Sequence, residues 1–379
     1  MCFPIPRRAK AARPRHVTEK QVGNSGPQSH SGLMATISLA APDPKRPAAI
    51  SRWLFCVAAL VLVMVVVGGI TRLTESGLSI TRWEPVSGAL PPVGEEAWQA
   101  EFQSYRQSPQ YQLVNTGMTL AEFKSIFFWE YVHRLLGRLI GLAFALPLIW
   151  FALRRAIPQG YGWKLVVILA LGGLQGAIGW WMVASGLVDR PEVSHIRLAI
   201  HLLTALAIFA ATLWVALDLR ALAADKSSRP ARLPTIGIWT LCVLALQLMF
   251  GAYVAGLEAG FAYASWPKMG DEWFPAAAPI YEPFARNFVD NPIVVQFVHR
   301  WLAFAVAAIA AILAAQAWRR RICWPALAVV AAVILQILLG IATLLSGVAL
   351  WIAVSHQAMA ALLLGAIVWA SHRLGERRA

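Results

Sequence analysis

Charged residues are scarce in this sequence. Asp, Glu, Lys and Arg together make up 14% of the 379 residues, whereas 58% are hydrophobic. A soluble globular domain carries about 25% charged residues, so the composition excludes a soluble domain. Acidic residues are fewer than basic ones, with 19 Asp and Glu against 33 Lys and Arg, and the formal net charge is +14. Because the basic residues stand between apolar runs and form no continuous face, they fit a membrane surface, and no nucleic-acid partner is expected.

Cysteine is also rare. The four cysteines are scattered, with Cys2 and Cys323 expected on the cytoplasmic side and Cys56 and Cys242 inside apolar runs. This distribution excludes a disulfide framework and any disulfide in an oxidising compartment. The 17 Trp and 27 Gly exclude a coiled coil and a largely disordered chain. A polytopic membrane protein is the class that remains.

Eight apolar runs are long enough, or nearly so, to cross a lipid bilayer, which takes about 20 residues of helix. Tryptophans at or near many of their ends fit the aromatic belts of membrane proteins. We therefore predict an all-α polytopic membrane protein with eight transmembrane helices, at residues 53–70, 127–153, 163–184, 196–217, 235–257, 292–318, 324–345 and 350–370.

The loops between these runs alternate in charge. One set is basic, and by the positive-inside rule it faces the cytoplasm together with both termini, while the acidic or neutral set faces outward. The basic set holds Arg154, Arg155 and Lys164, then Arg220, Lys226, Arg229 and Arg232, then Arg319, Arg320 and Arg321, then Arg373, Arg377 and Arg378; the acidic set holds Glu75, Glu84, Glu95, Glu96, Glu101 and Glu122, then Asp271, Glu272, Glu282 and Asp290.

Residues 1–52 are basic, rich in proline and serine and poor in acids, which predicts a disordered cytoplasmic tail. The same composition leaves open an organellar transit peptide, although its several prolines do not favour an amphipathic helix. Translation from Met34 is a further alternative. We expect a multi-pass protein of the bacterial inner (cell) membrane, with the mitochondrial inner membrane as the alternative.

The two halves of the sequence repeat one another. Gly68 through Trp83 aligns with Gly251 through Trp266 at an offset of 183 residues, and 174–186 aligns with 335–347 at an offset of 161. Each half holds four runs, so the halves share one orientation. We predict two tandem four-helix bundles related by a pseudo-twofold axis along the membrane normal, with two equivalent sites. The boundaries are a tail at 1–52, the first half at 53–217, a cytoplasmic linker at 218–234, the second half at 235–370 and a tail at 371–379.

Four histidines lie inside the predicted spans at a common depth: His133, His201, His299 and His356. Polar residues in a membrane span are costly and usually face a site. Two imidazoles facing each other fit haem iron best, because the porphyrin supplies the other ligands. Zinc would need four ligands and copper would usually recruit Cys or Met close by. The other four histidines, including His195 and His372, are expected to have no part in the site.

The residue one turn after each of these histidines is small, as a porphyrin lying against a helix requires. These residues are Gly137, Ala205, Ala303 and Ala360. The observation agrees with a haem site, although Ala and Gly are abundant in all the spans.

The halves differ at one acidic residue. Glu130 precedes His133 by three residues on the same helical face, whereas the matching position before His299 is Gln296. A carboxylate beside a haem can move protons and an amide cannot, although Glu130 can also simply neutralise Arg134.

Three arginines, Arg134, Arg138 and Arg300, lie at membrane depth and need anionic partners. Haem propionates suit them, and acidic side chains compete for them. Glu75 and Glu258 follow the first span of each half, and their flanking glycines permit a tight turn that either caps a haem edge or folds against the bundle.

Several long motifs resemble the haem A synthase family, the membrane enzymes that complete haem A for cytochrome oxidase. The resemblance extends from about Trp53 to His372 and is specific because the motifs agree in order and spacing. They are Gly68-Gly-Ile-Thr-Arg-Leu-Thr-Glu-Ser-Gly-Leu-Ser with Trp83, Pro85, Gly88, Pro91 and Pro92; Glu122-Phe-Lys-Ser-Ile-Phe; Glu130-Tyr-Val-His-Arg-Leu-Leu-Gly-Arg138; Trp266-Pro-Lys-Met-Gly; and Gln296-Phe-Val-His-Arg300. The chain lacks the cysteine pair that some members carry in the first outward loop, so it resembles the cysteine-free branch of bacteria and mitochondria.

The resemblance implies an oxidoreductase that converts a methyl group of haem O to a formyl group through a hydroxymethyl intermediate. His133 and His201 would hold the substrate haem, His299 and His356 would ligate the iron of a haem b, and Glu130 would be the essential acid, either transferring protons or stabilising a cationic intermediate. Implied partners are dioxygen, an unidentified electron donor, membrane lipid, haem O synthase (protohaem farnesyltransferase) and cytochrome oxidase assembly factors. Whether the chain forms a homo-oligomer stays open.

Two other classes compete with this enzyme. A dihaem b-type electron-transfer protein would use the same histidine pairs without changing a substrate. A transporter would also have parallel repeats, but it would place paired polar residues at the bilayer midplane, whereas the polar residues here lie toward the outer surface.

Overall fold

A computed structural model describes residues 45–83, 87–188 and 190–378 of the chain. The predicted tail up to residue 44, with Met34 and Cys2, lies outside these residues, as does Pro85 of the first motif. Within the described ranges eight helices are long and apolar enough to cross a membrane, so the chain is a multi-pass membrane protein. These helices are α1 (Pro47–Leu73), α4 (Leu120–Leu153), α5 (Gly162–Ala184), α6 (His195–Ala224), α7 (Thr235–Gly256), α9 (Pro292–Arg319), α10 (Cys323–Leu345) and α11 (Leu350–Gly375).

The eight predicted spans are therefore confirmed, but several helices are longer than their apolar runs. α4 begins at Leu120 because the Thr119 side chain accepts a hydrogen bond from the Glu122 N–H while the Glu122 carboxylate accepts one from the Thr119 N–H, a capping box. α1 begins at Pro47, a residue whose fixed φ suits the first turn. Apolar runs miss such polar first turns because capping residues, not hydrophobicity, fix where a helix begins.

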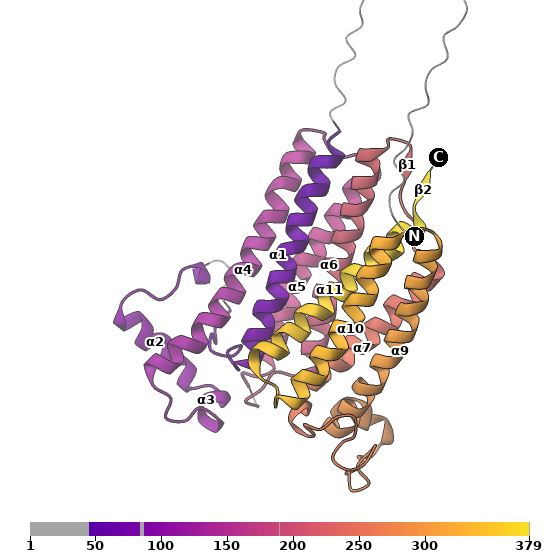
Figure 1. The fold of residues 1–379 in the computed structure, drawn as a ribbon. Coiled ribbons are helices and arrows are strands. Elements are labelled where there is room, and N and C mark those ends of the chain that lie inside the picture. Colours follow the sequence, from indigo (N-terminus) through magenta and orange to yellow (C-terminus); the bar gives the residue numbers. More distant parts are fainter. Residues whose placement is uncertain (1–44, 84–86, 189, 379) are drawn as a thin grey trace, which may run out of the picture. The chain divides into compact units, whose positions relative to one another are not determined.

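Short elements fill the two long loops at the end of the molecule away from the basic loops (Figure 1). The first loop holds η1 (Ser87–Ala89), α2 (Glu95–Arg106) and α3 (Pro109–Leu113). The second holds η2 (Ala259–Phe261), η3 (Phe284–Arg286) and α8 (Asn287–Asp290). An aromatic cluster of Phe102, Tyr105, Phe123 and Phe127 packs α2 against the start of α4. The first loop is thus folded onto the bundle beside the helix that carries Glu130.

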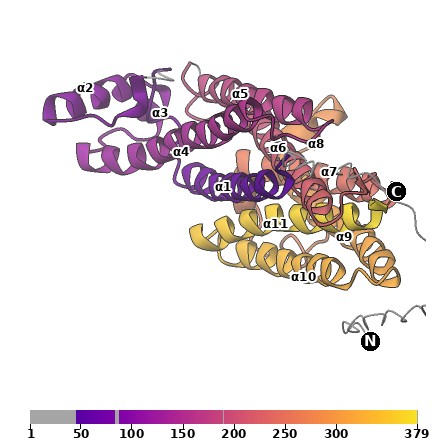
Figure 2. The same ribbon diagram turned by 90° about the horizontal axis from the view of Figure 1, so that it is seen from above.

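One continuous apolar core extends through all eight long helices. Helices α6 and α11 contact each other near its middle, and α1 contacts both of them, as the view in Figure 2 also shows. Residues 45–379 accordingly form one compact unit. The contacts do not separate two four-helix bundles, so that division stays a prediction.

The basic loops gather at one end of the bundle, which we call the basic end (Figure 1). There the backbone N–H of Arg46 donates to the Ala156 carbonyl over 2.9 Å. The strands β1 (Ser228–Arg229) and β2 (Arg377–Arg378) pair antiparallel and join the linker after α6 to the end of the chain.

Candidate functional site

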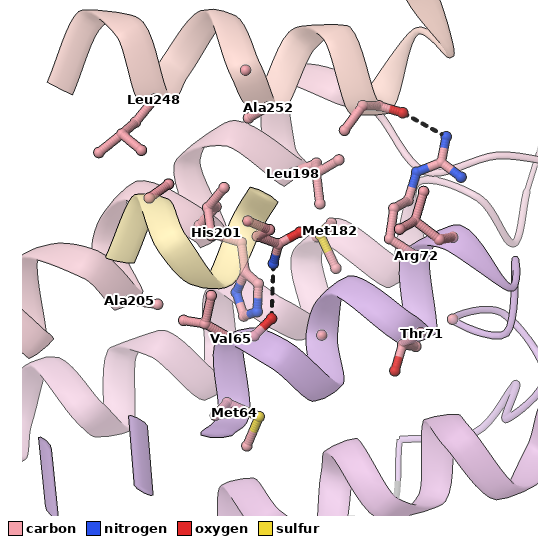
Figure 3. A pocket seen from close by; sticks show the side chains of 18 of the residues that line it. Met64, Val65, Thr71, Arg72, Met182, Leu198, His201, Ala205, Leu248 and Ala252 are labelled. Carbon is pink, nitrogen blue, oxygen red and sulfur yellow. Dashed lines mark hydrogen bonds between the residues drawn. The ribbon is translucent and has the colours of Figure 1, made fainter. Parts of the chain in front are cut away.

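A cavity of about 1250 Å³ lies among the eight long helices. All four histidines of the spans line it, one each from α4, α6, α9 and α11. Figure 3 shows part of the cavity, with His201 from α6, Met64 and Arg72 from α1, and Leu248 and Ala252 from α7. The sequence predicted two equivalent sites; the structure brings the residues of both halves to the walls of one continuous cavity.

The histidines lie in two pairs. His201 contributes to the electrostatic environment of His133, and His356 contributes to that of His299. Each of the four side chains is half-buried and lines the cavity. Each pair thus joins two helices of one half of the sequence, as the repeat predicts.

A glycine of a neighbouring helix packs against the ring edge of every one of these histidines. A Cβ added at Gly179 would lie 2.9 Å from Cε1 of His201, and one at Gly340 would lie 2.9 Å from Cε1 of His356. The same distances are 3.1 Å for Gly251 and His299 and 3.3 Å for Gly68 and His133. Any larger residue would push the ring away, so these glycines let the backbone of one helix support the imidazole of the next.

A glutamine one turn before the glycine makes a further contact in three of the four cases. The Nε2 amide of Gln175 donates to the His201 carbonyl over 2.8 Å and lies 3.1 Å from its Nδ1. Nε2 of Gln336 lies 3.4 Å from Nε2 of His356. Nε2 of Gln247 donates to the His299 carbonyl over 3.0 Å. We call each such unit, a glutamine and the glycine four residues after it, a Gln–Gly pair.

Sequence reasoning missed this role of the Gln–Gly pairs. The repeat showed that Gln175 and Gly179 align with Gln336 and Gly340, but it did not show which side chains they face. The same spacing in Gln247 and Gly251 is the signal that links them to a shared task.

Glu130 is 3% exposed and lies in the cavity wall. Its Oε2 accepts hydrogen bonds from Ser79 Oγ at 2.7 Å and from the Ile80 N–H at 2.8 Å. Its Oε1 pairs with Arg134 Nη2 at 2.6 Å and Nε at 3.0 Å. The carboxylate is thus fixed by the loop after α1 on one side and by its own helix on the other.

The matching residue of the second half is held more loosely. Gln296 is 1% exposed, and its amide donates to the Tyr263 carbonyl at 3.1 Å. Its Oε1 is buried without a hydrogen-bond partner. The difference between the halves that the sequence showed therefore extends to the contacts: the acid is bonded through both oxygens and the amide through its nitrogen.

The arginines next to the histidines bind loop carbonyls at repeat-equivalent positions. Arg134 Nη2 and Nη1 donate to Ile80 and Arg82 at 2.8 Å and 3.1 Å. Arg300 Nη2 and Nη1 donate to Tyr263 and Ser265 at 2.8 Å and 2.9 Å. These bonds, together with Glu130, neutralise or solvate the two cations inside the protein. Arg138 also lines the cavity.

The two acidic residues after α1 and α7 both border the cavity. Glu75 and Glu258 each have φ of 52°, so the turns that the sequence predicted are present. The left-handed residue is the glutamate itself and not a flanking glycine. Arg72 Nη2 lies 3.3 Å from Glu258 Oε1 and donates to the Ala255 carbonyl at 2.9 Å, which joins the first half to the second (Figure 3).

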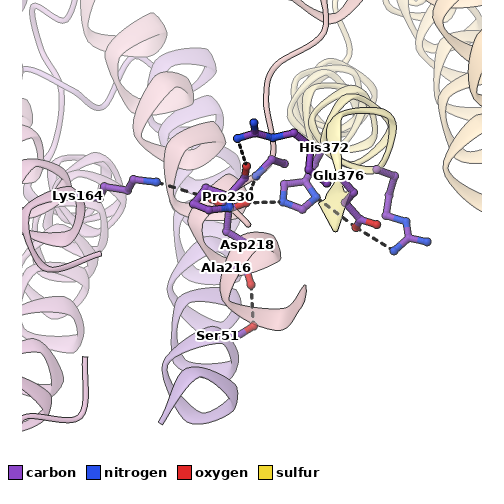
Figure 4. Close-up of polar contacts among 10 residues, drawn as sticks. Ser51, Lys164, Ala216, Asp218, Pro230, His372 and Glu376 are labelled. Carbon is purple, nitrogen blue, oxygen red and sulfur yellow. Dashed lines mark hydrogen bonds and ion pairs between the residues drawn. The ribbon is translucent and has the colours of Figure 1, made fainter. Parts of the chain in front are cut away.

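Two histidines that the sequence set aside are engaged elsewhere. His195 Nε2 lies 3.2 Å from Asp290 Oδ1. His372 is not in a tail, because α11 continues to Gly375, and its Nε2 lies 2.9 Å from Asp218 Oδ1 (Figure 4). Both His372 and Asp218 are 1% exposed at their side chains, and Lys164 Nζ lies 3.8 Å from Asp218 Oδ2. This buried cluster ties α5, α6 and α11 together at the basic end, away from the cavity.

Comparison with known proteins identifies the family. A family model for cytochrome oxidase assembly proteins, COX15-CtaA, matches residues 51–368. The chain belongs to the COX15-CtaA family. Curated relatives of this COX15-CtaA protein carry the name "Heme A synthase". The chain is 58% identical to the one from Rhizorhabdus wittichii over 88% of its own length and 96% of the relative's. It is 51% identical to the one from Sphingopyxis alaskensis, over 92% and 98% of the two lengths, and 51% identical to the one from Novosphingobium aromaticivorans, over 89% and 99%.

Proposed function

We propose that the chain is a haem A synthase, an oxidoreductase that converts a methyl group of haem O to a formyl group through a hydroxymethyl intermediate. The observation that carries this proposal is one cavity lined by two histidine pairs, in which the residue three before the first histidine is the buried acid Glu130 in one pair and the buried amide Gln296 in the other. The names of the relatives and the family match support the same function. The product, haem A, would serve cytochrome oxidase.

The residues present fit haem. The cavity exceeds the roughly 300–1,000 Å³ of common ligand sites, as two porphyrins require. Nδ1 of His299 and Nδ1 of His356 are buried without hydrogen-bond partners, so these rings are not saturated by the protein. Among the residues described, no three His, Cys, Asp or Glu side chains cluster for a metal ion. A pair of imidazoles suits an iron whose other ligands come from a porphyrin.

The Glu130 side of the cavity is the proposed substrate site. His133 and His201 would hold haem O there, and His299 and His356 would ligate the iron of a resident haem b. Arg134, Arg138 and Arg300 line the cavity and would face haem propionates. For Arg134 and Arg300, the bonds to loop carbonyls fix each guanidinium before a haem arrives.

Haem iron and dioxygen would supply the oxidising power when the substrate is bound. The protein's own part is placement and charge control. Ser79, Ile80 and Arg134 hold the Glu130 carboxylate at the cavity wall, where it can accept a proton or offset a positive charge. The amide of Gln296 can do neither, so the second site would keep its haem unchanged.

The chain would lie in the bacterial inner membrane with its basic end and both termini in the cytoplasm. Haem O, made by a haem O synthase in the same membrane, would reach the cavity from the lipid. Electrons would come from a separate donor, relayed by the haem b of the second half.

Co-expression with a haem O producer tests this function. Extracted haems separated by chromatography should include haem A and its hydroxymethyl precursor, and cells without the chain should contain haem O but neither of these two products. If purified protein retains two haems and yet haem O accumulates unchanged, the chain is a dihaem electron-transfer protein and the proposed function is wrong.

The glycine contacts give a matched pair of variants. Gly179→Ala places a methyl group 2.9 Å from Cε1 of His201, so the imidazole must shift. At Gly162, the first residue of α5, an added Cβ meets no atom within 4 Å, and this residue does not line the cavity. We expect Gly179→Ala to weaken haem binding in the first half by roughly tenfold, comparable to losing a supporting contact of a metal ligand. Gly162→Ala should bind haem like the parent, as measured by haem content and absorbance of the purified proteins. Equal haem content in both variants would show that the contact between Gly179 and His201 is not needed for haem binding.

A further inference from the structure

Three of the four cavity histidines are supported by a complete Gln–Gly pair, and the fourth is not. The sequence repeat that aligns Gly68 with Gly251 also aligns Met64 with Gln247. Met64 therefore occupies, one turn before Gly68, the position that a glutamine has in the other three units. His133, the histidine that Gly68 contacts, is the one whose support differs.

The change at this position removes a hydrogen bond between two helices. Gln247 on α7 donates to the backbone carbonyl of His299 on α9 at 3.0 Å. The thioether of Met64 on α1 has no hydrogen to donate, so it cannot make the matching bond to His133 on α4. Instead the Met64 Cε methyl lies 3.6 Å from the Cβ position of Gly137, one turn beyond His133. Met64 lines the cavity in Figure 3 with a long unbranched side chain that changes rotamer easily.

The His133 ring is also packed less closely by its glycine than the other three histidine rings are. A Cβ added at Gly68 would lie 3.3 Å from Cε1 of His133, the longest of the four such distances, the others being 2.9 to 3.1 Å. One turn after His133, α4 has Gly137, whereas the residue four positions after each of the other three histidines is alanine. Two separate features therefore give His133 more freedom than His201, His299 or His356.

The two proposed haem sites differ in how firmly the protein must hold the histidine ligands. A haem that reacts with dioxygen must open an axial position, and a substrate haem must also enter and leave. A resident electron-transfer haem keeps both axial ligands. The imidazole best suited to leave the iron is the one with the weakest support from the protein.

We propose that Met64 makes His133 the releasable ligand of the substrate haem, while Gln247 keeps His299 fixed on the resident haem. This inference rests on the proposed function, because it assumes haem in both sites. Met64 would be a positioning residue: it acts through His133 and α4 and not on the reacting atoms.

Carbon monoxide binding tests the proposal without turnover. Full-length protein is loaded with haem O in the absence of dioxygen, reduced with dithionite and titrated with carbon monoxide, which binds only where an axial ligand is released. The parent should bind it at the substrate haem and not at the resident haem. Met64→Gln should lower the affinity by roughly 2- to 13-fold, the value of one hydrogen bond of about 0.5–1.5 kcal/mol. Met64→Leu, which keeps an apolar side chain and adds no donor, should titrate like the parent.

The reciprocal variant keeps the test decisive if Met64→Gln does not fold. Gln247→Met removes the bond to the His299 carbonyl, and we expect the resident haem b to gain carbon monoxide binding. Unchanged titrations in Met64→Gln and Gln247→Met, with both haems present, would overturn the role of Met64 and leave the proposed function standing. Failure of the parent to take up haem O in its first half would overturn both.

Discussion

Replacing Glu130 by glutamine should lower the rate of haem A formation by about 100-fold or more, the range that a positioned acid or base contributes. The substitution keeps the size of the side chain but removes the carboxylate that distinguishes the first half from the second. Haem content should stay close to that of the parent, because the histidines and their Gln–Gly pairs are untouched. The measurement is chromatography of haems extracted from cells that produce haem O, together with the haem content of the purified variant.

The hydrogen bonds of the Glu130 carboxylate affect how Glu130→Gln is interpreted. Ser79 Oγ and the Ile80 N–H both donate to Oε2 of Glu130, so an amide NH₂ at that position would face two donors. The loop after α1 can therefore shift in Glu130→Gln even if the fold holds. Glu122→Gln is the matched control on the same helix: Glu122 is exposed, and glutamine also serves in a capping box. Normal haem A formation by Glu130→Gln would contradict the assignment of Glu130 as the essential acid.

Loss of one second-half histidine should empty the resident haem site. In His299→Ala or His356→Ala, the iron loses an axial ligand, and we expect affinity for haem b to fall by at least about 100-fold, since removing only a supporting contact of a ligand already costs 10–100-fold. Haem A formation should stop as well if the resident haem relays electrons. Absorbance and haem extraction of the purified protein measure the first effect, and haem analysis of the cells measures the second.

His195→Gln provides the control for these variants. His195 starts α6 and pairs with Asp290, and it is not among the residues that line the cavity. A glutamine amide can donate a hydrogen bond to Asp290, so haem content should be that of the parent. Retention of haem b by both His299→Ala and His356→Ala would contradict the proposed ligands.

Hydropathy and charge were sufficient to predict the helices, because a membrane demands about 20 apolar residues per span whatever the neighbouring helices do. The same patterns failed at helix ends. α11 passes Ala370 and continues to Gly375, because His372 is buried against α6 and lies 2.9 Å from the Asp218 carboxylate of that helix, so it needs no water. Such a pair joins residues 154 positions apart, and periodicity along one helix does not reveal it.

Some residues of the site could be predicted from the sequence, and others could not. The four histidines and Glu130 stand out in the sequence, since polar residues within spans are few and the repeat pairs them. Gln175, Gln247 and Gln336 do not, because their part depends on which helix lies beside which histidine. Arg134 illustrates the reverse: the sequence left its partner open between a propionate and Glu130, and the structure pairs it with Glu130 and two loop carbonyls.

The central claim is that each half holds an iron porphyrin between two imidazoles across the cavity. Low-temperature electron paramagnetic resonance of the purified ferric protein, loaded with haem O without turnover and compared with its total haem content, tests this most directly. We predict two haems per chain with low-spin signals of bis-histidine iron, of which one disappears in His299→Ala and the other in His201→Ala. A single haem per chain, or signals that survive in both variants, would contradict it.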